Sequence, residues 1–224
     1  MRETEARLAN EYPGTAEDLC ELDFETPFQL LTATILSAQT TDVRVNAATP
    51  GLFAQFPDAK ALAGADPGVV EQLVMTTGFY RNKTKSIIGM AKAVVGEFDG
   101  EVPRTMEELV KLPGVGRKTA NVLLSVAMDT PGLPVDTHVT RLSQRLGLTE
   151  KTDAVKIESD LCAVLKPEQW GGFSLRLILH GRRVCVARTP RCAECVLNDF
   201  CPSAQLVSGS GKKKAIKDGL MQRS

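Results

Sequence analysis

The stretch LPGVGRKTANVLL, Leu112 to Leu124, places a glycine–valine–glycine turn directly before a helical pattern. Glycine adopts positive φ readily and lets another group approach the backbone, so such a turn can expose its amide N–H groups. Exposed amides beside a helix N-terminus can hold an anion. Because TMEELVK before the turn is also helical by pattern, we predict a helix, a glycine hairpin and a second helix. A plain connection between packed helices, with solvated Arg117 and Lys118, is the alternative.

The hairpin follows no strand, as a dinucleotide-binding fold would require, and it is too short for a Walker loop. A phosphate held by backbone amides carries no information about base sequence. The hairpin therefore suits a protein that binds any stretch of DNA.

Helical periodicity runs through most of the chain. Apolar residues recur at helical spacing in three stretches, Phe28 to Ile35, Ile87 to Val95 and Ile157 to Leu165. Helix starts are indicated by Asp66 before a proline, by Asp136, and by Thr105 with a glutamate three residues later. Since no sustained apolar/polar alternation indicates a strand, we expect an all-α protein of about ten short helices.

The composition of the 224-residue chain is that of an ordinary folded protein, with 43% hydrophobic and 24% charged residues and a formal net charge of zero. No apolar run approaches the roughly 18 residues of a membrane span. The first residues, MRETEARLANEYPG, lack the apolar core of a signal peptide. We therefore expect a cytoplasmic protein with no membrane contact.

Positive charge is concentrated in two places. The segment Arg176 to Arg191 holds five arginines and no acid, and it is either a solvated face or a binding surface. After Cys201 the chain has few apolar residues and a lysine cluster, so residues 203–224 are predicted to form a flexible basic tail.

Four of the six cysteines are clustered with the spacing C-x6-C-x2-C-x5-C: Cys185, Cys192, Cys195 and Cys201. Such clusters in a cytoplasmic protein favour a metal centre over disulfides. Only the middle pair has the spacing of a zinc knuckle, and the wider arms surround an iron–sulfur cube more easily, with zinc and disulfides as alternatives. A loop closed in this way would hold the nearby arginines outward. Cys20 and Cys162 are expected to be buried thiols.

Four stretches together resemble the bacterial endonuclease III family: LPGVGRKTANVLL, PVDTHVTRL, LSAQTTD and LHGRRVCVARTPRCAECVLNDFC. The likeness extends from about Leu22 to Cys201. Members of this family are DNA glycosylases with β-lyase activity in the helix-hairpin-helix superfamily, and they act in base excision repair.

The resemblance implies two helical lobes with DNA in the cleft between them. Residues 20–131 would form a six-helix lobe with the hairpin, and residues 1–19 with 132–202 would form a lobe that carries a 4Fe–4S cluster. The four clustered cysteines would be its ligands. The likeness further implies a monomer that associates with the nucleoid through DNA.

The resemblance also implies the chemistry. Lys118 would attack the C1′ carbon of an oxidised pyrimidine nucleotide in double-stranded DNA, expel the base and form a Schiff base with the opened sugar. β-Elimination would then cut the strand, and an abasic site would be processed in the same way. Attack requires a neutral amine. Asp136 would be the catalytic carboxylate as well as the cap of the helix that follows it.

Other matched positions would contact DNA: Gly114, Val115, Gly116 and Thr119 in the hairpin, with Gln39, Phe79, Tyr80 and His138. The target base must leave the duplex, so Gln39 would fill the gap while Phe79 and Tyr80 form an apolar wedge. Phe79 departs from the aliphatic residue that relatives often carry. Each position has a structural alternative, which is helix capping for Gln39 and packing for the aromatic pair and His138.

Two other functions share part of the pattern. Adenine glycosylases have the hairpin and the cysteine spacing, but they usually lack the hairpin lysine and carry a further C-terminal domain. A non-catalytic iron–sulfur module that binds DNA or transfers electrons would need neither Lys118 nor Asp136. The presence of both residues favours the bifunctional enzyme.

Overall fold

The computed structural model describes residues 1–204 of the chain. Over this range it contains eleven α-helices, three short 3-10 helices and no strand, which confirms the all-α prediction. The helices are α1 (Arg2–Glu11), α2 (Pro27–Leu36), α3 (Asp42–Gln55), α4 (Ala59–Ala63), α5 (Pro67–Val74), α6 (Tyr80–Glu97), α7 (Met106–Leu109), α8 (Arg117–Ala127), α9 (Thr137–Arg145), α10 (Ala154–Cys162) and α11 (Trp170–Arg183). The 3-10 helices are η1 (Met75–Thr77), η2 (Pro167–Gln169) and η3 (Cys192–Glu194).

The expectation of about ten helices agrees with the eleven found in residues 1–204, but not all of them are short, because α6 has 18 residues. The basic tail was predicted over residues 203–224, and its residues 205–224 lie outside the described range. No helix within residues 1–204 is long and apolar enough to cross a membrane.

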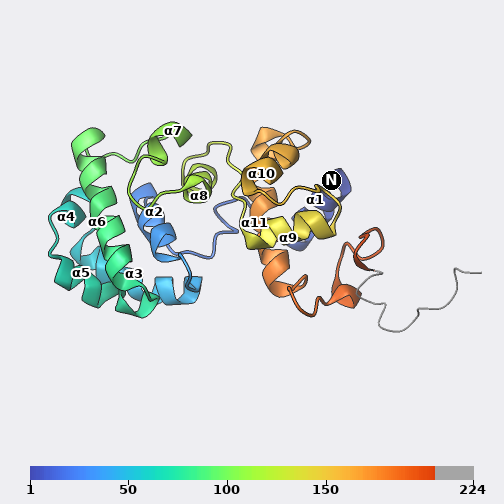
Figure 1. Ribbon diagram of the computed structural model, residues 1–224, viewed down its shortest axis with the longest axis horizontal. Helices are drawn as coiled ribbons and strands as arrows, with labels where there is room; N and C mark the ends of the chain where they lie inside the picture. Colours follow the sequence, from blue (N-terminus) through green and yellow to red (C-terminus); the bar gives the residue numbers. More distant parts are fainter. Residues whose placement is uncertain (205–224) are drawn as a thin grey trace, which may run out of the picture.

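The helices form two lobes (Figure 1). Helices α2 to α8 make one lobe, and α1 lies with α9, α10 and α11 in the other, although α1 is far from them in sequence. The first lobe is therefore a continuous piece of chain, while the second joins both ends of the described range.

Helix α2 forms the centre of the first lobe, and nine of its ten residues are buried. A helix that is apolar all round must lie in the interior, and α2 packs against α3, α6 and α8. The hydroxyl of Thr26 caps it by accepting the Gln29 amide, and Pro27 occupies its first turn. The predicted helix at Phe28 to Ile35 is confirmed.

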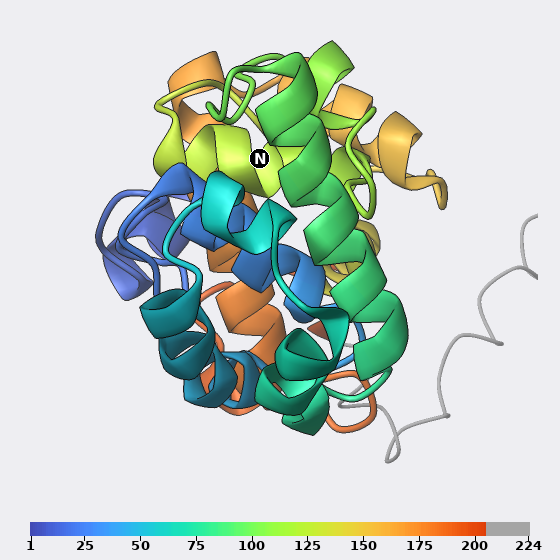
Figure 2. The same cartoon turned by 90° about the vertical axis from the view of Figure 1, so that its left-hand side faces the viewer.

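Helix α6 runs along the length of the first lobe beside α4 and α5 (Figure 2). Its inner face, including Ile87, Met90 and Val94, is fully buried. The helical spacing read from the sequence thus marks the face that packs, although Val95 is only half-buried.

Helix α11 forms the centre of the second lobe, where Phe173 and Leu177 are fully buried. It packs against α1 and α9 and also reaches α8 of the first lobe. The Ser174 hydroxyl donates to the carbonyl of Pro134 in the segment that joins the lobes. The start of α9 is therefore tied to the packed centre of the second lobe.

Candidate functional site

The hairpin between α7 and α8 depends on one glycine. Gly114 has a φ of +79°, and a Cβ atom there would lie 2.8 Å from the Cβ of Ser86 on α6. Gly116 has a φ of −98° in extended backbone, so of the two hairpin glycines only Gly114 uses positive φ. A Cβ on Gly116 would meet no atom within 4 Å.

The first turn of α8 has no side-chain cap. Gly116 is its N-cap residue and offers no side chain, so the amides at the start of the helix are not bonded by a cap. Uncapped amides at a helix start favour an anion. The Val115 side chain is buried, and its amide already donates to the Leu112 carbonyl, so this residue anchors the hairpin in the core.

The two cations after the hairpin have different surroundings. Arg117 donates from Nε and Nη2 to both carboxylate oxygens of Glu158 on α10, at 2.8 and 2.7 Å. Lys118 is exposed and has no hydrogen bond or ion pair within the described part of the chain. The alternative of a plain helix connection with two solvated cations was therefore wrong for Arg117, whose charge is paired across the two lobes.

Asp136 is the N-cap of α9, as its position before the helix predicted. Its Oδ1 accepts the amides of His138 and Val139 at 2.7 and 2.9 Å. The other oxygen, Oδ2, has no hydrogen bond among residues 1–204. One carboxylate thus holds the helix start and keeps a second acceptor available.

His138 is half-buried and lies against Gly181 of α11. Its Nδ1 is 3.2 Å from Nη2 of Arg141. Burial lowers the pKa of His138, although nearby Asp136 opposes this effect. The packing role that the sequence left open is present, and a contact with DNA remains a prediction.

Gln39 and Phe79 are both exposed, and both have left-handed backbone, with φ of 56° and 50°. Phe79 is 66% exposed, so the alternative of core packing was wrong for this residue. Tyr80 is half-buried against the core, and Arg81 lies over its ring at 5.6 Å. Of the proposed aromatic wedge, Phe79 alone projects from the surface.

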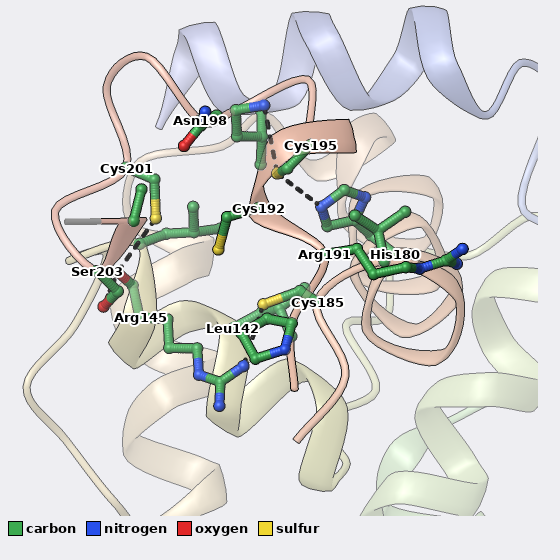
Figure 3. A pocket seen from close by; sticks show the side chains of 15 residues that line it. Leu142, Arg145, His180, Cys185, Arg191, Cys192, Cys195, Asn198, Cys201 and Ser203 are labelled. Atoms are coloured by element: carbon green, nitrogen blue, oxygen red, sulfur yellow. Dashed lines mark hydrogen bonds between the residues drawn. The ribbon is translucent and has the colours of Figure 1, made fainter. Parts of the chain in front are cut away.

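The four clustered cysteines line one hollow (Figure 3), which encloses about 440 Å³ including its open mouth. They lie after α11, on η3 and in the segment that follows it, and all four are half-buried. Within residues 1–204, no three His, Cys, Asp or Glu side chains converge closely enough to hold a single metal ion. The donor set is four soft sulfur atoms spaced around a shared hollow, which suits an iron–sulfur cluster.

Two side chains that the sequence analysis did not identify support this hollow. Arg145 of α9 donates to Cys185 Sγ at 3.3 Å and to the carbonyls of Val186 and Ala187 at 3.0 and 2.7 Å. His180 of α11 is buried, with Nε2 at 3.2 Å from Cys195 Sγ and Nδ1 at 3.1 Å from the Tyr12 hydroxyl. Neither residue has a local pattern that marks it, because both act through contacts distant in sequence.

The basic stretch Arg176 to Arg191 was expected to be either a solvated face or a binding surface, with the closed cysteine loop holding Arg182, Arg183, Arg188 and Arg191 outward. These four arginines are exposed. Four of the five arginines in the stretch are nevertheless paired with carboxylates of the chain: Arg176 with Glu5, Arg182 with Glu21 and Asp42, Arg183 with Glu21, and Arg191 with Glu194. Arg188 is exposed and has no such partner in the described range.

The two isolated cysteines, Cys20 and Cys162, are half-buried rather than fully buried. Burial raises the pKa of both thiols, that of Cys162 to about 11. Both are therefore protonated and unreactive near neutral pH.

Two family models match the chain. Residues 32–167 match the HhH-GPD superfamily of base excision DNA repair proteins, which spans the hairpin, Lys118 and Asp136. Residues 185–201 match the iron–sulfur binding domain of endonuclease III, which begins and ends on cysteines of the cluster.

Relatives named Endonuclease III match this chain over nearly their whole length. The protein from Synechocystis sp. is 57% identical over 195 residues, covering 87% of this chain and 88% of the relative. The protein from Bacillus subtilis is 43% identical over 205 residues, covering 91% and 90%, and that from Escherichia coli K12 is 40% identical over 200 residues, covering 88% and 92%. The chain belongs to the endonuclease III family.

Solved structures agree with this endonuclease III membership. A non-covalent endonuclease III–DNA complex superposes with a TM-score of 0.86 at 37% identity, covering 92% of this chain and 95% of that one. A trapped endonuclease III–DNA covalent intermediate has the same TM-score and coverage at 38% identity.

As a member of the endonuclease III family, the protein is a DNA-binding base excision repair enzyme with glycosylase and lyase activity. It carries a 4Fe–4S cluster, so the zinc and disulfide alternatives were wrong. The adenine glycosylase and the non-catalytic module are likewise set aside.

Proposed function

We propose that the enzyme excises oxidised pyrimidines from double-stranded DNA and cuts the strand at the resulting or at a pre-existing abasic site, acting as a monomer at the nucleoid. Lys118 is the nucleophile and Asp136 the catalytic carboxylate. The observation that carries this proposal is the contrast within the hairpin. Arg117 is paired with Glu158, whereas Lys118 beside it is exposed and unpartnered in residues 1–204.

In this proposal the hairpin binds the phosphate backbone of the DNA strand. The uncapped amides at the start of α8 donate to a DNA phosphate, with Thr119 at the same turn, and this contact is independent of base sequence. A phosphate held there brings the adjoining sugar to Lys118, which follows the cap residue by two positions. Binding thus places the reacting carbon at the amine.

The reaction then proceeds on the chain's own groups. The neutral amine of Lys118 attacks C1′ and the bond from C1′ to the base breaks. Oδ2 of Asp136 accepts the proton that the amine loses and passes it to the departing base, while Oδ1 keeps α9 in place. The bond from C1′ to the ring oxygen then breaks, the ring oxygen takes a proton from water, and the lysine nitrogen forms a protonated Schiff base with C1′. Loss of a proton from C2′ then expels the 3′ phosphate by β-elimination.

Opening of the duplex is assigned to the exposed loops. Phe79 enters the base stack as the wedge, and Gln39 faces the base left without a partner. Tyr80 supports Phe79 from the half-buried side, and His138 lines the site from α9.

The lobe bounds belong to the same proposal, with residues 20–131 as the hairpin lobe and residues 1–19 with 132–202 as the cluster lobe. Cys185, Cys192, Cys195 and Cys201 are the ligands of the cluster. The cluster supplies structural support rather than bond chemistry, because its hollow is lined by neither Lys118 nor Asp136.

Borohydride trapping tests the proposal. We expect the parent enzyme to become covalently attached to duplexes that contain thymine glycol or an abasic site, and Lys118→Gln to abolish the adduct while still binding DNA. Lys111→Gln, a change at an exposed lysine on the other side of the hairpin, is the matched control and should trap like the parent. An adduct formed by Lys118→Gln at the parental rate would assign the chemistry to another amine. Release of adenine from mismatches, with no excision of oxidised pyrimidines, would contradict the proposed substrate.

A further inference from the structure

The segment before α6 holds Phe79 in an unfavourable conformation. Gly78 and Phe79 both have positive φ, 69° and 50°, and Phe79 is the N-cap residue of α6 without a side-chain cap. A bulky side chain in left-handed backbone is uncommon and costs on the order of 1 kcal/mol or more. Since the ring is also mostly exposed, its own packing does not offset this strain.

Lys83 forms hydrogen bonds to the backbone on both sides of this bend. Its Nζ donates to the Thr77 carbonyl at 2.7 Å, and its amide donates to the Phe79 carbonyl at 3.1 Å. Thr77 is itself buried, and its hydroxyl donates to the Val74 carbonyl at 2.7 Å. One residue therefore fixes the carbonyls before and after Gly78.

Burial of the Lys83 amine has a cost in folding free energy. Lys83 is 5% exposed, and it forms no ion pair within residues 1–204. Burial lowers the pKa of Lys83. A buried amine that lacks a carboxylate partner destabilises a fold, and methionine would fill the same space without that penalty. The chain thus keeps a buried donor where an apolar side chain would serve packing alone.

We propose that Lys83 is a positioning residue for duplex opening: it holds the bend at Gly78 so that Phe79 projects from the surface as a fixed wedge. This inference rests on the proposed wedge function of Phe79. Lys83 itself touches neither DNA nor the reacting atoms. Its loss leaves the phosphate grip at Gly116 and the amine of Lys118 in place and impairs the opening of paired DNA.

The test compares two substrates for each variant under single-turnover conditions with enzyme in excess. One is a duplex with thymine glycol paired to adenine, and the other holds the same lesion in a bubble of unpaired bases, which needs no wedge. We expect Lys83→Met to slow excision on the order of tenfold from the paired duplex, the effect of one lost hydrogen bond from a charged group. Excision from the bubble should be nearly unchanged.

The ratio of the two rates is measured within one preparation, so it does not depend on the fraction of folded enzyme. Lys92→Met, at an exposed lysine farther along α6, is the matched control and should keep the parental ratio. Because Lys83 acts through Phe79, the double variant with Phe79→Ala should be no slower than Phe79→Ala alone.

Three results would overturn the inference. Equal slowing of Lys83→Met on both substrates would indicate a merely structural role, and additive effects with Phe79→Ala would indicate an independent one. A parental ratio in Phe79→Ala would remove the wedge and the role of Lys83 together. A parent enzyme inactive on thymine glycol would instead overturn the proposed function on which the inference rests.

Discussion

At the scale of single residues, the capping role of Asp136 and its proposed catalytic role are chemically separable. Oδ1 accepts two amides at the start of α9, and Oδ2 is unpartnered in the described range. Capping needs only an oxygen acceptor, whereas stabilising a positively charged sugar or accepting a proton needs the carboxylate.

Asp136→Asn should therefore reduce single-turnover excision by roughly 10²-fold or more and leave the melting temperature and DNA affinity nearly unchanged. Asparagine caps helices about as well as aspartate, so the fold should persist. Asp153→Asn is the control, because Asp153 caps α10 by accepting the Lys156 amide without belonging to the proposed site. Equal losses of stability and activity in Asp136→Asn would show that the cap alone explains its effect.

The two hairpin glycines differ in whether the backbone has room and a suitable φ for a larger residue, and the sequence could not distinguish them. Gly114→Ala should destabilise the protein by about 1–3 kcal/mol, since alanine is strained at positive φ and its Cβ would collide with Ser86. Gly116→Ala should cost less, about 1 kcal/mol or below, because no atom lies within 4 Å of the new Cβ and only the poorer helix capping by alanine remains.

The added methyl group at Gly116 still narrows the approach of a phosphate to the amides of α8. Affinity should therefore fall equally for duplexes of different sequence, measured at one stated salt concentration. Parental affinity in Gly116→Ala, or a loss confined to one sequence, would count against the phosphate grip.

At the scale of elements, the ion pair between Arg117 and Glu158 joins α8 of the hairpin lobe to α10 of the cluster lobe. The Glu158 side chain is 13% exposed and that of Arg117 is 48% exposed. An ion pair with one half-exposed partner contributes little to stability. We therefore expect its main effect to be that it withholds a cation from DNA at the position next to Lys118.

Glu158→Gln should release Arg117 toward the phosphates. We expect the slope of log affinity against log salt concentration to steepen by about one unit, the effect of one additional phosphate contact. Stability should change by less than about 1 kcal/mol. Glu150→Gln, which removes an exposed and unpartnered charge from the same lobe, should leave the slope unchanged. An unchanged slope in Glu158→Gln would mean that Arg117 does not reach DNA.

Local elements were predictable because their causes are local. Thr26, Asp66 and Asp136 cap helices through amides two or three residues away, and apolar spacing marked the buried faces of α2 and α6. The partners of Arg117 and Arg182 lie 41 and 140 or more residues away, so only the fold reveals them. The left-handed backbone at Phe79 could not be predicted either, because phenylalanine does not favour this conformation.

At the scale of the whole molecule, the cysteine hollow is where the two ends of the described chain meet. Arg7 of α1 bonds both carboxylate oxygens of Asp199 at 2.6 and 2.9 Å and the Val196 carbonyl at 2.9 Å. Arg145 of α9 holds the segment after Cys185, and its carbonyl accepts the hydroxyl of Ser203. The segment 185–204, which carries the four cysteines, therefore bonds to α1 and to α9 of the second lobe.

Removal of the cluster should consequently destabilise the cluster lobe and leave the hairpin lobe folded. The purified enzyme should contain about four irons per chain and no stoichiometric zinc, and chelation of the iron should lower its melting temperature. Hydrogen exchange should then accelerate in α1, α9 and residues 185–204, while α2 and α6 keep their protection because no residue of these two helices lines the hollow.

Cys20→Ser is the matched control, because it removes a half-buried thiol that does not line the hollow and should retain the iron. Cys195→Ser should lose iron and reproduce the exchange pattern of the chelated enzyme, since serine is a poor ligand for iron–sulfur clusters and breaks the contact with His180. Loss of protection spread evenly over both lobes would show that the cluster supports the whole fold. Protection unchanged in α9 would show that the start of this helix, and with it Asp136, is held without the cluster.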